Sequence, residues 1–222
     1  MKKVLIIGDS SALPRDELSF DKTYYAMLLK LPGRMAEINA MANNTSYRIY
    51  TDIDAFMYYG YHPDTVILNY GIVDVYPRPY PNKVYRLLSC TGLLPYIDKV
   101  LKKTKLYYKL GDLFNFKEVS LKKFESYTEG IIQKLLEREV KQIIIIGVIR
   151  PYRGLLQSKK VDHEVKQYNN IYTEITQKYD EVDYIDIYED SDESFTVWDG
   201  YHYSEKASQY LADKIEKLIK HD

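Results

Sequence analysis

Two short motifs near the ends of the chain contain the residue types of a nucleophilic site. Gly8-Asp9-Ser10 directly follows the apolar run 4–7, and Asp199-Gly200-Tyr201-His202 precedes the last amphipathic stretch. A serine, a histidine and an aspartate are the groups that make a hydroxyl nucleophilic at neutral pH. Because the aspartate lies three residues before the histidine, one tight loop can present both side chains to the same place. These residues predict a serine hydrolase or acyltransferase.

The elements that must position these motifs alternate between buried strands and amphipathic helices. Candidate strands cover 3–7, 35–41, 65–69, 142–148 and 183–188. Apolar residues at helical spacing predict helices over 121–140 and 161–179 and a last helix from Ser204. This alternation predicts an α/β protein in which a parallel sheet has helices on both faces.

The position of Ser10 strengthens the prediction. A sharp turn from the first strand into a helix can expose this side chain at the edge of the sheet. The amides at the start of such a helix also favour developing negative charge. The chain has no Gly-x-Gly-x-x-Gly pattern, which disfavours a dinucleotide site.

Bulk composition excludes several classes of partner. The 222 residues carry 31 basic and 32 acidic side chains, so there is no electrostatic case for nucleic acid or an acidic membrane. Cys90 is the only cysteine, so we expect no internal disulfide and no cysteine-ligated metal. We also expect no cofactor. The apolar run after the basic start is too short for a signal peptide, which predicts a cytoplasmic protein without membrane insertion. The sequence leaves the oligomeric state open.

The segment 75–119 does not fit a simple strand–helix alternation. It is rich in proline, tyrosine and lysine, and it follows the third candidate strand, so it emerges where ligands bind in open α/β folds. It is either a lid or substrate wall inserted into a single domain over 1–222, or an oligomerisation arm or surface decoration.

Over nearly its whole length the chain resembles the SGNH hydrolases, also called the GDSL esterase/lipase family. Gly8-Asp9-Ser10-Ser11 matches the first sequence block of that family, and the motif ending at His202 matches the last. The resemblance implies a three-layer α/β/α sandwich of flavodoxin-like type with about five parallel strands. It also implies that Ser10 is the nucleophile, His202 the base and Asp199 the residue that orients the base.

The two middle blocks depart from the family pattern. Asn43 stands where a glycine amide helps to bind the oxyanion, beside the amide of Ser10. In Gly71-Ile72-Val73-Asp74, Val73 replaces the asparagine whose side chain is an oxyanion donor. Loss of one such donor costs about 10²–10³ in rate. Either Asn44 or Asn69 substitutes, or the enzyme is slow on generic esters, or the site no longer turns over.

The resemblance implies O-acylated carbohydrates or lipids as substrates and no metal. We expect an esterase that removes small acyl groups, with acetyl favoured, from a glycan or sugar intermediate. The alternatives are a carbohydrate O-acyltransferase with the same three residues and a catalytically weak glycan-binding or scaffold protein. Candidate substrate-binding residues are Asp9, Arg78 and Arg150, because each follows a predicted strand at the functional edge and the arginines suit a carboxylate or phosphate.

Overall fold

The computed structural model describes residues 2–15, 17–31, 33–42, 44–57, 62–152 and 158–219. Five parallel strands form one sheet in the order β2-β1-β3-β4-β5. They are β1 (Lys2–Gly8), β2 (Arg34–Ala40), β3 (Thr65–Asn69), β4 (Gln142–Ile146) and β5 (Val182–Ile185). The predicted α/β fold with a parallel sheet is confirmed.

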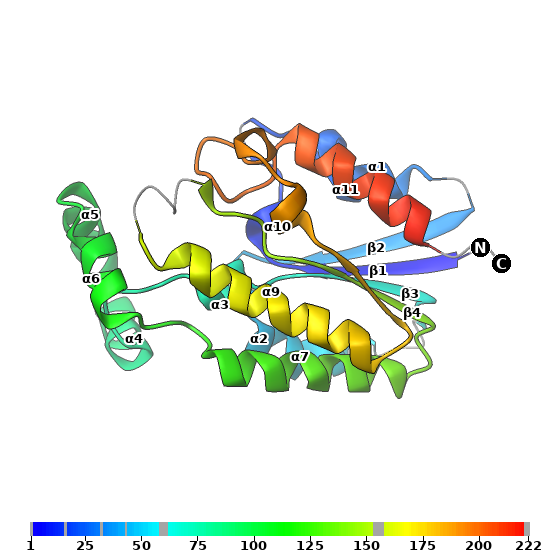
Figure 1. Ribbon diagram of the computed structural model, residues 1–222, viewed down its shortest axis with the longest axis horizontal. Coiled ribbons are helices and arrows are strands. Elements are labelled where there is room, and N and C mark those ends of the chain that lie inside the picture. The colour runs from blue at the N-terminus through cyan, green and yellow to red at the C-terminus, as the bar shows by residue number, and fades with distance from the viewer. Residues whose placement is uncertain are drawn as a thin grey trace.

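Helices cover both faces of this sheet (Figure 1). One face packs against α1 (Tyr24–Leu29) and α11 (Glu205–Leu218), and the other packs against α2 (Ser46–Phe56), α7 (Leu121–Leu136) and α9 (Val161–Lys178). The isoleucines of β4 are fully buried because alternate side chains enter the two cores, Ile143 and Ile145 on one side and Ile144 and Ile146 on the other. The sandwich therefore has three layers.

Two predicted strands end earlier than their apolar patterns. β4 stops at Ile146, since the backbone of Val148 hydrogen-bonds the Asn169 side chain on α9 at 2.8 and 2.9 Å. β5 stops at Ile185, since the Asp186 side chain caps α10 (Ile187–Asp190). Polar side chains that replace ladder bonds thus fix both strand ends.

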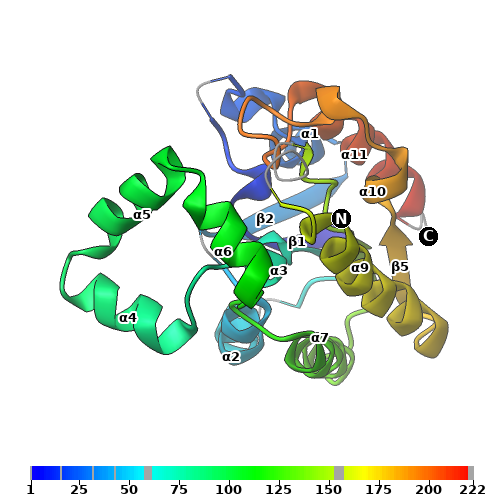
Figure 2. The same ribbon diagram turned by 60° about the vertical axis from the view of Figure 1, so that its left-hand side comes forward.

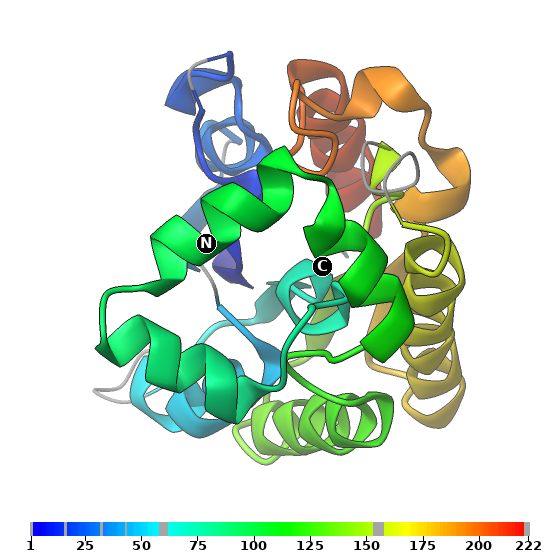
Figure 3. The same cartoon turned by 90° about the vertical axis from the view of Figure 1, so that its left-hand side faces the viewer.

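The segment after β3 forms a group of helices at the carboxyl edge of the sheet. It contains α3 (Ile72–Val75), α4 (Asn82–Cys90), α5 (Leu94–Lys103) and α6 (Leu106–Phe114). Figures 2 and 3 show α4, α5 and α6 as an arm that projects from the sandwich and lies across the end of the sheet. No side chain of α4 or α5 is buried, so these two helices contribute little to the core.

Three 3₁₀ turns complete the described elements: η1 (Ser10–Ala12), η2 (Phe20–Lys22) and η3 (Glu193–Phe195). Within the described residues, no helix combines the length and the apolar character that a membrane span requires.

Candidate active site

Ser10 begins η1 at the carboxyl edge of the sheet, immediately after β1. The Asp9 amide donates to the Asn69 carbonyl oxygen at 2.9 Å, and the Asp9 side chain accepts from the Ser11 amide at 2.8 Å. Gly8 must lack a side chain, because a Cβ there would lie 2.8 Å from Tyr25 Oη. The local sequence therefore turns the chain sharply and leaves Ser10 at the sheet edge.

The loop before α11 brings the second motif to the first. The Tyr203 amide donates to the Ser11 carbonyl oxygen at 2.9 Å, which joins the two ends of the chain directly. Inside the loop, the Val197 amide donates to the His202 carbonyl oxygen at 2.9 Å. Gly200 makes the turn at φ +81°, a conformation that favours glycine.

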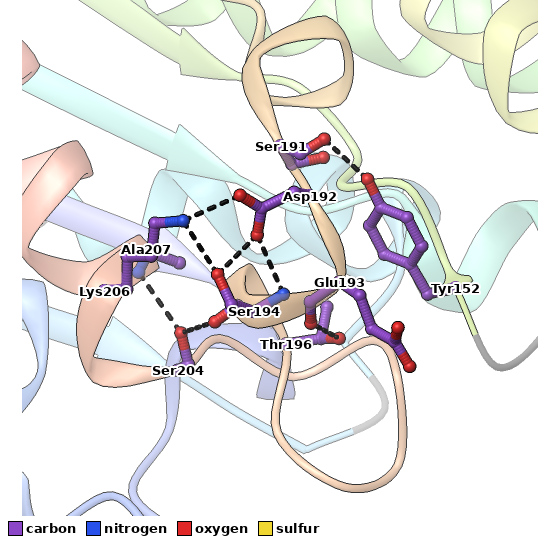
Figure 4. Close-up of polar contacts among 9 residues, drawn as sticks. All are labelled: Tyr152, Ser191, Asp192, Glu193, Ser194, Thr196, Ser204, Lys206 and Ala207. Atoms are coloured by element: carbon purple, nitrogen blue, oxygen red, sulfur yellow. Dashed lines mark hydrogen bonds and ion pairs between the residues drawn. The ribbon is translucent and has the colours of Figure 1, made fainter.

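A polar network anchors both ends of this loop (Figure 4). The Lys206 ammonium contacts Asp192 Oδ2 and Ser194 Oγ, both at 2.7 Å. Ser204 Oγ donates to the Ser194 carbonyl oxygen at 2.6 Å and accepts from the Ala207 amide, which caps α11. These bonds fix the segment that precedes the loop to the helix that follows it.

The side chains of Ser10, His202 and Asp199 form one hydrogen-bonded row. Ser10 Oγ lies 3.2 Å from His202 Nε2, and His202 Nδ1 lies 2.5 Å from Asp199 Oδ2. Asp199 Oδ1 accepts from the backbone amides of His202 and Tyr201 at 3.1 and 3.2 Å, so the carboxylate is held at both oxygens. The structure thus brings the three predicted residues together.

Charge on Asp199 sets the tautomer of the imidazole. Burial alone raises the pKa of Asp199, but hydrogen bonds from the His202 side chain and backbone outweigh it and hold that pKa below its ordinary value. An ionised carboxylate only accepts hydrogen bonds, so Nδ1 carries the proton of a neutral imidazole and Nε2 presents a lone pair toward Ser10. This arrangement can remove a proton from the serine hydroxyl.

A cleft of about 620 Å³ opens over this row. Its walls include the three side chains of the row, residues of the turn after β3, and Arg15 and Ala42. The arm contributes Lys102, Tyr107 and Tyr108, and the 197–203 loop contributes Trp198 and Tyr201. Trp198 is 67% exposed and therefore lines the cleft rather than filling the core.

The predicted oxyanion donors have different positions. Asn43 lies outside the described residues. The Asn44 side-chain amide donates to the Gly8 carbonyl oxygen at 3.0 Å, and the Asn69 side-chain amide donates to Tyr203 Oη at 2.8 Å. Both asparagines are buried, and neither lines the cleft. Val73 does line it, so the cleft presents a valine where the family pattern has an asparagine.

Asp74, the next residue, supports the fold. It is fully buried, and its carboxyl accepts from the Ser46 amide and hydroxyl at 3.1–3.2 Å, which fixes the start of α2. Burial raises the pKa of Asp74 well above its ordinary value, although the bonds from Ser46 oppose this. Gly71 begins the same turn at φ +127°, which only glycine adopts readily.

Two of the three predicted substrate-binding residues do not reach the cleft. Asp9 is 1% exposed and caps η1, and burial raises the pKa of its carboxyl. Arg150 lies 4.5 Å from the Tyr188 ring and 3.9 Å from Glu189 instead. Arg78 does line the cleft and forms an ion pair with Glu118. Asp9 and Arg150 therefore do not line this cleft, and substrate binding by either residue stays a prediction.

Sequence reasoning missed one charged residue beside the row. Arg15 lines the cleft, and its Nη2 lies within hydrogen-bonding distance of His202 Nε2. No strand, helix or spacing singles out Arg15 in the sequence; only the fold brings it to the imidazole. Among the described residues, no cluster of three or more histidines, cysteines or acidic residues could hold a metal ion.

The fold of the chain is that of the SGNH, or GDSL, hydrolases. The structure is similar to an acetyl xylan esterase, with a TM-score of 0.68, 17% identity, and 98% of this chain and 100% of that chain covered. It is also similar to a lipase/acylhydrolase from Enterococcus faecalis, with a TM-score of 0.60, 14% identity and coverage of 99% and 95%. A third similar structure is a member of the lipolytic G-D-S-L family from Veillonella parvula. Its TM-score is 0.60 at 11% identity, and the match covers 99% of this chain and 98% of that chain.

These likenesses confirm the predicted resemblance at the level of the fold. No protein-family model and no curated protein matches the sequence.

Proposed function

We propose that the chain is a serine esterase that removes small acyl groups, acetyl above all, from a carbohydrate or sugar intermediate. One observation carries the proposal: Ser10 Oγ, the His202 ring and the Asp199 carboxylate form a continuous hydrogen-bonded row at the base of an open cleft. The fold it shares with esterases and acylhydrolases supports the same reaction class.

In the proposed mechanism, His202 Nε2 takes the proton of Ser10 as the hydroxyl oxygen attacks the ester carbonyl. The imidazolium that forms is stabilised by Asp199, 2.5 Å away. Collapse of the tetrahedral intermediate breaks the bond to the leaving alcohol, which receives the proton from His202. Water then attacks the acyl-Ser10 ester through the same base, and the acid product leaves.

The oxyanion requires hydrogen-bond donors at the turn after β1. The backbone amide of Ser10 is our first candidate, because it donates to none of the described residues and lies at the start of η1. The Val73 side chain offers no donor, so we expect slower turnover of simple esters than in enzymes with an asparagine at this position.

A carbohydrate leaving group is supported by the walls of the cleft. Five aromatic side chains line it, which together offer flat apolar faces with polar edges that suit a sugar ring: Tyr76, Tyr107, Tyr108, Trp198 and Tyr201. A volume of about 620 Å³ is also much larger than an acetyl group needs. The acetyl xylan esterase that shares the fold points to the same substrate class.

Labelling with a fluorophosphonate tests the proposal. Wild type should react, and Ser10→Ala should not, whereas the neighbouring control Ser11→Ala should retain labelling because the Ser11 side chain is buried against Asn69. Equal labelling of wild type and Ser10→Ala would refute the catalytic role. Mass spectrometry of products formed with an acetyl donor and a sugar acceptor would reveal acyl transfer in place of hydrolysis.

A further inference from the structure

The cleft contains more positive charge than the proposed mechanism uses. Arg15, Arg78 and Lys102 line it, while Asp199, the only acidic side chain among its described lining residues, is hydrogen-bonded to His202. Arg78 has a partner in Glu118. No carboxylate among the described residues pairs with Arg15 or Lys102.

The backbone holds Arg15 firmly beside the imidazole. The Arg15 amide donates to the Leu18 carbonyl oxygen and the Leu18 amide donates to the Arg15 carbonyl oxygen, both at 2.9 Å, which closes a tight loop. The guanidinium Nη2 contacts His202 Nε2, and the guanidinium Nε is buried without an acceptor in the described part of the chain. A buried, unsatisfied donor in a binding cleft indicates that a ligand group completes its hydrogen bonding.

Arg15 and Ser10 compete for the same atom. Because His202 Nδ1 carries its proton toward Asp199, Nε2 has a single lone pair, and that lone pair accepts one good hydrogen bond. Both Ser10 Oγ, at 3.2 Å, and Arg15 Nη2 are placed to donate to it. While the guanidinium donates a hydrogen bond to this lone pair, His202 cannot take the proton of Ser10.

We infer that the ester carries an anionic group, a carboxylate or a phosphate, near the scissile bond, and that Arg15 binds this group. The inference rests on the proposed function and names its substrate class. A guanidinium pairs with either anion through two parallel hydrogen bonds, which draws Nη2 away from the imidazole and leaves the Nε2 lone pair to Ser10. Lys102 adds a second positive charge at the cleft wall. Arg15 is thus a specificity residue that couples anion binding to activation of the serine.

A matched set of acetyl esters tests the inference. The substrates are para-acetoxybenzoate, para-acetoxyphenyl phosphate and the neutral methyl ester of para-acetoxybenzoate, and the quantity compared is kcat/KM. The proteins are wild type, Arg15→Ala and Arg48→Ala. Arg48 is an exposed arginine that pairs with Asp52 on α2 and does not line the cleft, so it controls for loss of surface charge.

Wild type should prefer at least one charged ester over the neutral one, and the better of the two identifies the anion. Arg15→Ala should lose about 10- to 100-fold on that ester, the range of a hydrogen bond to a charged group. Its kcat/KM for the neutral ester should rise, because His202 Nε2 is then free for Ser10. Arg48→Ala should match wild type. An equal fall on charged and neutral esters in Arg15→Ala, or no charge preference in wild type, would overturn the inference.

A binding measurement separates this inference from the proposed function. Calorimetric titration of inorganic phosphate and of benzoate into Ser10→Ala protein requires no turnover. Binding of one anion to Ser10→Ala, lost in the double variant Ser10→Ala/Arg15→Ala, would support the anion site. This result would hold even if fluorophosphonate labelling had refuted the esterase. Binding that survives loss of Arg15 would overturn the anion site and leave the esterase intact.

Discussion

Replacing Val73 by asparagine should restore an oxyanion donor. Val73 is half-buried on α3, and its side chain lines the cleft together with Ser10 and His202. Valine and asparagine are similar in volume, so the substitution fits the space. It exchanges an apolar side chain for an amide whose N–H groups can point at the developing negative charge.

The size of the effect follows from what such a donor contributes. Removal of one oxyanion donor costs about 10²–10³ in turnover, equivalent to about 2.7–4 kcal/mol. An asparagine introduced at position 73 would have no neighbours selected to orient its amide. We therefore expect only part of the full gain in turnover, about 10- to 100-fold. The loss of apolar burial should lower the free energy of unfolding by about 1 kcal/mol, given that Val73 is only partly buried.

The assay follows the hydrolysis of para-nitrophenyl acetate at saturating substrate, with turnover normalised to the fraction of Ser10 labelled by fluorophosphonate. Val73→Thr is the matched control, because it keeps the branched shape and adds a polar group that cannot reach as far as an amide. Faster turnover in Val73→Asn alone is the expected outcome. Unchanged or slower turnover in folded, fully labelled protein would show that another donor already completes the oxyanion site.

Further substitutions test the catalytic row and the turns that support it. Asp199→Asn should lower kcat by about 10⁴ with little change in KM, since the neutral amide no longer enforces the His202 tautomer; a loss below tenfold in steady-state assays would contradict this. Gly71→Ala should lower the free energy of unfolding by about 2–4 kcal/mol in urea titrations, because its Cβ would meet Val148 Cγ2 at 2.6 Å at φ +127°. Gly33→Ala, at φ +73° in open space, should lose only about 1 kcal/mol, and equal losses would refute the steric argument. The pKa of Asp74 is raised in the folded protein, so the free energy of unfolding of wild type should fall as pH rises from about 4 through that pKa. In Asp74→Asn the fall should be smaller. Identical pH profiles for the two proteins would argue against a buried, protonated carboxyl group.

The residue pattern along the chain was enough to predict the α/β architecture and the three chemical groups of the site. Four consecutive isoleucines show no alternation of apolar and polar residues. Such a continuous apolar run predicts a strand that is covered on both faces, and β4 is buried in this way. The turn at Gly8-Asp9-Ser10 is likewise local, because the Asp9 side chain accepts from the Ser11 amide within the same motif. Features of this kind depend on residues close together in the chain, so they can be predicted from the sequence.

Which other side chains enter the cleft depends on how elements distant in the chain pack together. Position after a strand does not reveal burial: Asp9 is buried and Arg150 packs on Tyr188, so neither lines the cleft. Arg15 reaches His202 from 187 residues away along the chain. Contacts between residues so distant depend on the packing of the elements between them, and no local spacing encodes that packing.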